Sequence, residues 1–214
     1  MFYRPGEDHG LRGDPFNQLV VPRPIGWISS VDEHGRVNLA PFSFFNAVAY
    51  VPPQVMFSTT GPHADGGVKD SLHNVRETQE FVFNLATWSL REAVNVTSTP
   101  APREVDELAL AGLTSSPGRV VGVPLVAESP VHLECTLVET VELRSPDRAE
   151  HVNTVIFGEV VGVHIADAAI EDGRVDMLVL DPIARLGYDQ YTRVAEVFSM
   201  TRPGWPLPAT PAAG

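Results

Sequence analysis

The sequence contains almost no cysteine and no long apolar segment. Cys135 is the only cysteine among 214 residues, so no disulfide can form within one chain, and a cysteine-based metal or iron–sulfur centre is excluded. No apolar run reaches the ~18 residues that a membrane-spanning helix needs. The first residues also lack the basic and apolar regions of a secretory signal. We therefore expect no membrane span, no metal site and a cytoplasmic location.

Positive charge is scarce as well. The formal net charge is −12, which repels polyphosphates and argues against nucleic acid as a partner. Lys69 is the only lysine, and the other 14 of the 15 basic residues are arginines. A small phosphorylated ligand remains compatible with this composition, because local charge-assisted hydrogen bonds outweigh a distant average charge.

The dinucleotide-binding fingerprint G-x-G-x-x-G is absent, since Gly66 and Gly67 precede a helical segment without the required spacing. Many short strands without an alternating strand–helix rhythm predict an antiparallel barrel rather than a doubly wound sheet. The pattern predicts strands at 25–31, 36–40, 44–50, 54–60, 80–86, 131–143, 153–165, 177–180 and 191–198. It predicts helices at 69–78, after Ser89 and at 103–111.

The segment from Pro41 to Asn46 combines three phenylalanines with small polar residues. Proline cannot donate to a β-ladder, so we expect Pro41 to interrupt the pairing and to leave later N–H groups free. A flat heteroaromatic ligand needs such an apolar surface with backbone donors along its edge. Taken alone, these phenylalanines are more typical of a core than of a ligand site. Alternation predicts that Phe44 and Phe45 point to opposite faces.

Further segments follow in order: PRPIGWISS, NLAPFSFFNAV, PPQVMFS, DGGVKDSLHN, ETQEFVFNLA, SPVHLEC, VIFGEVVGVHIAD and PIARLGYDQY. Together they resemble the flavin-reductase-like family of FMN-binding split barrels. The chain departs from that family at Tyr188, where a glycine is common. The resemblance implies a mainly β fold, an antiparallel split β-barrel of Greek-key type with a few short helices. This domain would cover 21–202, after an N-terminal arm at 1–20 and before a Pro/Ala-rich tail at 203–214.

The resemblance also implies which residues contact FMN. An FMN phosphate needs several charge-assisted hydrogen bonds, which hydroxyls, a cation and free helical N–H groups can supply. The residues implied for the phosphate and ribityl chain are Ser29, Ser30, Ser58, Thr59, Lys69, Asp70 and Ser71. Those implied for the isoalloxazine ring are Ala40, Pro41, Phe42, Ser43, Phe44, Phe45 and Asn46. From the residues alone, Asp70 is as well explained as a helix cap.

His164 is the only polar residue in the apolar segment 160–165. Such a histidine is more often a solvent-facing residue than a catalyst, but the resemblance implies a position near the open face of the flavin. There it would order the nicotinamide or donate a proton.

The activity that the resemblance implies is an NAD(P)H:flavin oxidoreductase. It would act as a homodimer with NADH or NADPH as a transient co-substrate, and reduced flavin would pass to an oxygenase partner or lose its electrons elsewhere. Two alternatives stay open at this point. One is a flavoredoxin-like FMN electron carrier without NAD(P)H turnover, and the other is a non-catalytic FMN-binding module.

Overall fold

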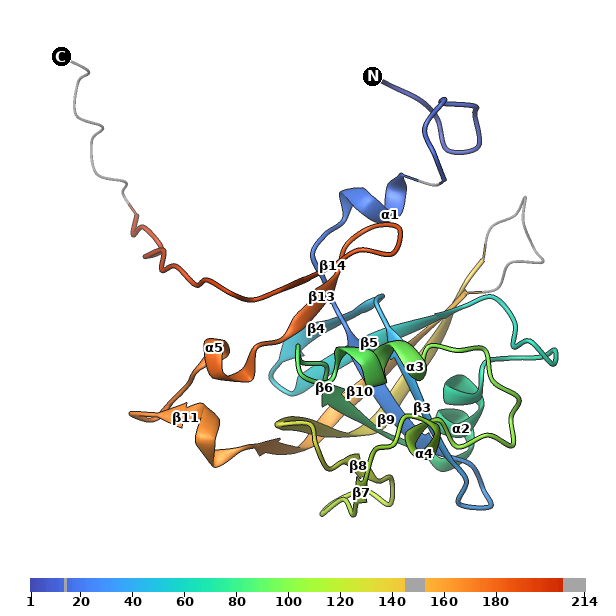
Figure 1. Ribbon diagram of the computed structural model, residues 1–214, viewed down its shortest axis with the longest axis vertical. Helices are drawn as coiled ribbons and strands as arrows, with labels where there is room; N and C mark the ends of the chain where they lie inside the picture. The colour runs from blue at the N-terminus through green and yellow to red at the C-terminus, as the bar shows by residue number, and fades with distance from the viewer. Residues whose placement is uncertain (14, 145–152, 206–214) are drawn as a thin grey trace.

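The computed structural model describes residues 1–13, 15–144 and 153–205, and its main feature is a seven-stranded antiparallel sheet (Figure 1). The strand order is β3-β2-β6-β9-β10-β5-β4. The strands are β2 (Gly26–Val31), β3 (Val37–Phe42), β4 (Phe45–Tyr50), β5 (Pro53–Thr60), β6 (Glu80–Leu85), β9 (Val131–Leu143) and β10 (Asn153–Ile165). This sheet confirms the mainly β, antiparallel split-barrel prediction.

Smaller elements surround this sheet. A three-stranded sheet contains β1 (Arg23–Pro24), β13 (Ile183–Arg185) and β14 (Tyr191–Arg193). Two-stranded ladders join β7 (Ser115–Ser116) to β8 (Leu125–Val126) and β11 (Ile170–Glu171) to β12 (Arg174–Val175). The helices are α1 (Phe16–Leu19), α2 (Asp70–Thr78), α3 (Arg91–Val96), α4 (Glu107–Leu110), α5 (Met177–Leu180) and the 3₁₀ turn η1 (Asp167–Ala169).

The predicted strand at 177–180 is wrong, because this segment is helix α5. The carboxylate of Asp176 accepts hydrogen bonds from the backbone N–H groups of Leu178 and Val179, so a helix cap decides the local structure. The strand predicted at 191–198 ends at Arg193. Helix α4 is shorter than the predicted 103–111 and begins after Asp106, whose side chain caps it.

Pro41 does not interrupt the pairing as predicted. It lies inside β3 opposite Trp27 of β2, and the ladder continues to Phe42. The sheet tolerates this proline because β3 is an edge strand. One side of an edge strand has no neighbouring strand and needs no N–H donor there. The bend that separates β3 from β4 is therefore limited to residues 43–44.

Aromatic side chains fill the core between the strands. Phe45 is buried and its ring stacks on Phe83 at 4.8 Å between centroids, whereas Phe44 is 36% exposed. This confirms that only one of the two neighbouring phenylalanines belongs to the core. A Cβ atom on Gly26 would lie 2.4 Å from the ring of Phe45, so glycine is required for this approach.

A buried polar layer attaches the segment that leads into β8 to one face of the sheet. The Ser29 hydroxyl donates to the Pro124 carbonyl at 2.7 Å, and the side-chain oxygen of Asn84 accepts from the Val126 N–H at 2.9 Å. The Nε2 atom of His132 lies 2.9 Å from the Val126 carbonyl. Side chains therefore supply the hydrogen bonds that a further strand would otherwise make.

Cys135 lies in the core, and burial followed by the nearby Glu134 charge raises its pKa to about 12. The thiol is therefore buried and unreactive. Tyr188, which stands where the family often has glycine, adopts a φ of +52°. Its hydroxyl donates to the Arg12 carbonyl at 2.9 Å, which ties this left-handed residue to the N-terminal arm.

Both ends of the described chain extend away from the sheet (Figure 1). Of the predicted tail at 203–214, residues 206–214 lie outside the described residues. No helix in the described part of the chain is long and apolar enough to span a membrane.

Candidate functional site

A cavity of about 300 Å³ lies beside the bend between β3 and β4, at the open edge of the barrel. Among the described strands, β3 and β4 stand at opposite ends of the sheet order and do not pair with each other. The Ser58 N–H donates to the Phe44 carbonyl at 2.9 Å and connects the bend to β5. The volume is at the lower end of the range typical of small-ligand sites.

The cavity brings together most of the residues implied by the resemblance. Its walls include Ala40, Pro41, Phe42, Ser43, Phe44, Ser58, Lys69, Asp70 and Ser71. These come from β3, the bend, β5 and the start of α2. The implied residues that do not line it are Ser29, Ser30, Phe45, Asn46 and Thr59.

Local geometry explains these exceptions. Alternation along β5 buries Thr59 with the core and turns Ser58 and Thr60 to the cavity, a period-two pattern that could have identified Thr60 from the sequence. The hydroxyl of Ser30 accepts a hydrogen bond from the Asn74 amide at 3.1 Å and is fully buried. Ser29 and Phe45 take part in the polar layer and the core described above.

The start of α2 provides the cationic end of the cavity. Within the described chain, the Lys69 ammonium makes no hydrogen bond or ion pair. The Ser71 hydroxyl accepts from the Asn38 amide at 2.9 Å, so its own proton remains available. The first N–H groups of a helix are also free to donate. This end of the cavity can bind a phosphate.

Arg103 holds the loop before α2 and compensates the charge of Asp70. One Arg103 nitrogen binds Asp70, and another donates to the carbonyls of Gly66 and Val68 at 2.8 and 3.0 Å. The Nε2 atom of His63 lies 3.2 Å from the second Asp70 oxygen. Asp70 thus organises the loop through its side chain and is not an N-cap acceptor.

The remaining wall consists of residues that sequence reasoning missed. The segment 97–101 and Glu107 also line the cavity. Trp27, which is fully buried, donates from its ring nitrogen to the Thr97 hydroxyl at 2.9 Å and fixes the start of this segment. In the sequence, only Pro100 and Pro102, which interrupt regular helices and strands, indicated that this segment is a loop.

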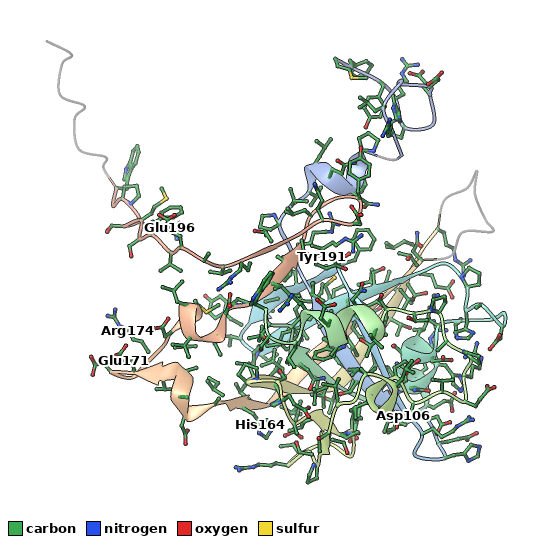
Figure 2. All side chains as sticks on the ribbon, viewed as in Figure 1. Asp106, His164, Glu171, Arg174, Tyr191 and Glu196 are labelled. Atoms are coloured by element: carbon green, nitrogen blue, oxygen red, sulfur yellow. The ribbon has the colours of Figure 1, made fainter. Side chains whose placement is uncertain are left out.

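His164 does not line the cavity. Its Nε2 atom donates to the carboxylate of Glu134 at 2.5 Å. In Figure 2, His164 lies well apart from Asp106, the neighbour of the cavity residue Glu107. In this chain the imidazole therefore belongs to the polar layer under β7 and β8, through its hydrogen bond to Glu134.

Glu134 is fully buried and accepts hydrogen bonds from three consecutive N–H groups, those of Arg119, Val120 and Val121, at 2.7 to 3.1 Å. Burial alone would raise the pKa of Glu134. The hydrogen bonds from His164 and the backbone outweigh this effect and lower the pKa to about 2. Glu134 is thus an ionised anchor for the loop that precedes β8.

We expect His164→Asn to leave flavin affinity and kcat/KM for a nicotinamide nearly unchanged, because the imidazole lies outside the cavity. The same change removes a hydrogen bond to a carboxylate and should lower the free energy of unfolding by about 1.5–3 kcal/mol. Steady-state kinetics and urea denaturation measure the two effects separately. A loss of ~10–100-fold in kcat/KM with unchanged flavin affinity would instead assign His164 to donor positioning.

Comparison with known proteins places this architecture in a family. The model of the flavin reductase like domain matches residues 18–189. An uncharacterised protein of Halalkalibacterium halodurans is 39% identical over 184 residues, which cover 86% of this chain and 87% of that protein. The structure of nitrilotriacetate monooxygenase component B from Bacillus cereus superposes with a TM-score of 0.84 and 32% identity, covering 94% of this chain and 98% of that one.

Flavoredoxin of Desulfovibrio vulgaris has the same fold, with a TM-score of 0.73 and 20% identity over 91% of this chain and 96% of that chain. The chain belongs to the flavin reductase like domain family.

Proposed function

We propose that this protein binds FMN in the cavity beside the β3–β4 bend and transfers a hydride from NADH or NADPH to flavin. The observation that carries the proposal is the free Lys69 ammonium beside the Ser71 hydroxyl, in one cavity with Phe42 and Phe44. The basic end suits the phosphate, and the aromatic end suits the isoalloxazine ring.

Bound FMN would supply the acceptor for the hydride of the nicotinamide. The contribution of the chain is to orient the ring and to stabilise negative charge that develops on it. Ser43 and Phe44 lie between two strands, and no ladder of the described sheet uses their N–H groups. These N–H groups are the donors that we assign to the oxygen-bearing edge of the ring.

In this proposal the nicotinamide cofactor binds only transiently, because the chain lacks a dinucleotide-binding fingerprint. Reduced flavin would then leave for an oxygenase. The similarity to a structure described as a monooxygenase component supports this outcome. The flavoredoxin-like electron carrier is the second candidate, and it differs in having no turnover with NAD(P)H.

Anaerobic spectroscopy of the purified protein tests the proposal. We expect FMN to bind, and its visible absorption to bleach when NADH or NADPH is added. The preferred nicotinamide is the one that bleaches it faster. If both nicotinamides leave the flavin oxidised while dithionite or reduced ferredoxin reduces it, the electron-carrier function replaces the reductase function. Absence of any flavin binding would contradict both.

We further propose that the protein is a homodimer, with the edge strand β4 in the interface. Val48 and Tyr50 on β4 and Val51 just after it are exposed in the single chain, and the strand carries no charged residue. Exposed edge strands without charge are prone to pair with another chain. The segment after β14 also exposes Phe198 and Met200, which a partner subunit could cover.

We expect Val48→Lys to convert the dimer into a monomer and to weaken FMN binding, because the cavity lies next to β4. Val120→Lys, the same substitution at an exposed valine of the loop before β8, serves as the control and should leave the dimer intact. Light scattering over a dilution series, with flavin release followed in parallel, measures both effects. A wild-type monomer that holds FMN tightly would contradict the dimer proposal.

A further inference from the structure

Glu107 is a buried carboxyl in the wall of the cavity. The residue is 6% exposed, and its Oε2 atom accepts a hydrogen bond from the Leu39 N–H at 3.2 Å. No cation forms an ion pair with it among the described residues. An ionised carboxylate in such a place is unfavourable unless a positive charge compensates it.

The other charged groups around Glu107 do not supply this compensation. Asp106 on the same helix and Asp70 at the start of α2 are both negative, and Asp70 already takes the charge of Arg103. Lys69 and His63 line the same cavity from the loop before α2, but neither forms an ion pair with Glu107. Burial first, and then the charges of Asp70 and Asp106, raise the pKa of Glu107 above its ordinary value.

A phosphate brings close to two further negative charges into this cavity. Glu107 lines the same cavity as the proposed phosphate donors Lys69 and Ser71. Its carboxyl binds the N–H of Leu39, and the amide of the preceding residue, Asn38, donates to Ser71. Repulsion between a carboxylate and a phosphate in a poorly solvated cavity costs far more than in water. One proton on the carboxyl removes this repulsion.

We propose that Glu107 takes up a proton from solvent when FMN binds, so that flavin binding is coupled to protonation of this side chain. The inference rests on the proposed function, namely FMN in this cavity. The proton adds to one carboxyl oxygen, and no other bond changes. A neutral carboxyl keeps an acceptor oxygen for the Leu39 N–H and gains one O–H donor for the ligand.

The coupling predicts how affinity depends on pH. Because the complex holds more protons than the free protein, FMN affinity falls as pH rises, with a slope set by the number of protons taken up. Riboflavin lacks the phosphate and should show a smaller dependence. Glu107 thus determines over which pH range the cavity distinguishes the two flavins.

Isothermal titration calorimetry in buffers of different ionisation enthalpy counts the protons directly. The titrations compare wild type, Glu107→Gln and the matched control Glu104→Gln, an exposed carboxylate three residues away. Protonation of the FMN phosphate contributes equally to all three proteins. We expect Glu107→Gln to take up fewer protons than wild type, by up to one per site, and Glu104→Gln to match wild type.

At pH 8 we also expect Glu107→Gln to bind FMN more tightly than wild type, by up to ~10-fold, because the amide carries no charge that repels the phosphate. FMN binding with the same proton uptake in wild type and Glu107→Gln would overturn this proposal and leave the flavin function intact. No binding of FMN or riboflavin to wild type would instead contradict the proposed function, and the present proposal with it.

If Glu107→Gln does not fold, infrared difference spectroscopy of the wild-type protein tests the same proton. Addition of FMN should then produce the carbonyl band of a protonated carboxyl group. Riboflavin should produce a weaker one. A spectrum without such a band on FMN addition would overturn the proposal.

Discussion

Glu134→Ala is expected to lower the free energy of unfolding by about 3–5 kcal/mol, because several hydrogen bonds to a buried charged group are lost together. The change leaves the N–H groups of Arg119, Val120 and Val121 without their acceptor and removes the partner of His164. Chemical denaturation followed by circular dichroism measures the effect.

A matched control lies on the same strand. Glu139 is exposed on β9, so Glu139→Ala should change the free energy of unfolding by no more than about 0.5 kcal/mol. Similar destabilisation by both changes would show that Glu134 does not anchor the loop before β8.

Acid titration of the wild-type protein measures the stabilisation by the Glu134 carboxylate in a second way. The folded-state pKa of Glu134, about 2, lies below its ordinary value of 4.5. The stabilisation from this carboxylate is therefore complete above pH ~4.5 and is lost as pH falls toward 2. The difference corresponds to about 3 kcal/mol. Glu134→Gln should lack this part of the acid dependence.

Lys69→Gln is expected to weaken FMN binding by about 1.5–3 kcal/mol, the usual contribution of a hydrogen bond to a charged group. This corresponds to a ~10–150-fold higher Kd. The physical reason is that the Lys69 ammonium has no hydrogen-bond or ion-pair partner among the described residues and is available to the phosphate. The nearby Arg103 already binds Asp70 and the loop carbonyls. Flavin fluorescence titration measures the affinities.

Two controls accompany this measurement. Riboflavin should bind wild type and Lys69→Gln alike, because it carries no phosphate. Arg174→Gln makes the same change in net charge at an exposed position on β12, far from the cavity, and should leave FMN affinity unchanged (Figure 2). Equal affinity of the wild-type protein for FMN and riboflavin would remove the phosphate site.

Local patterns in the sequence were enough to predict the strands of the barrel. Period-two runs and turn residues are local signals, so they predicted every strand of the main sheet closely. The short lysine-led motif before α2 and the PFSF segment place Lys69, Ser71 and Phe42 in a single cavity, as expected. That these two segments meet was implied by the family resemblance, because local patterns carry no information on contacts between distant segments.

Contacts between segments that are far apart in the sequence became known only from the folded structure. Arg103 reaches Asp70, and Glu107 reaches the cavity, through packing of α4 against β3, which no local pattern records. Ser29 and His164 occur in segments that resemble the family, yet each finds a polar partner under the loop before β8. A buried hydroxyl or imidazole must satisfy its hydrogen bonds where the fold places it, and that placement depends on contacts far apart in the sequence.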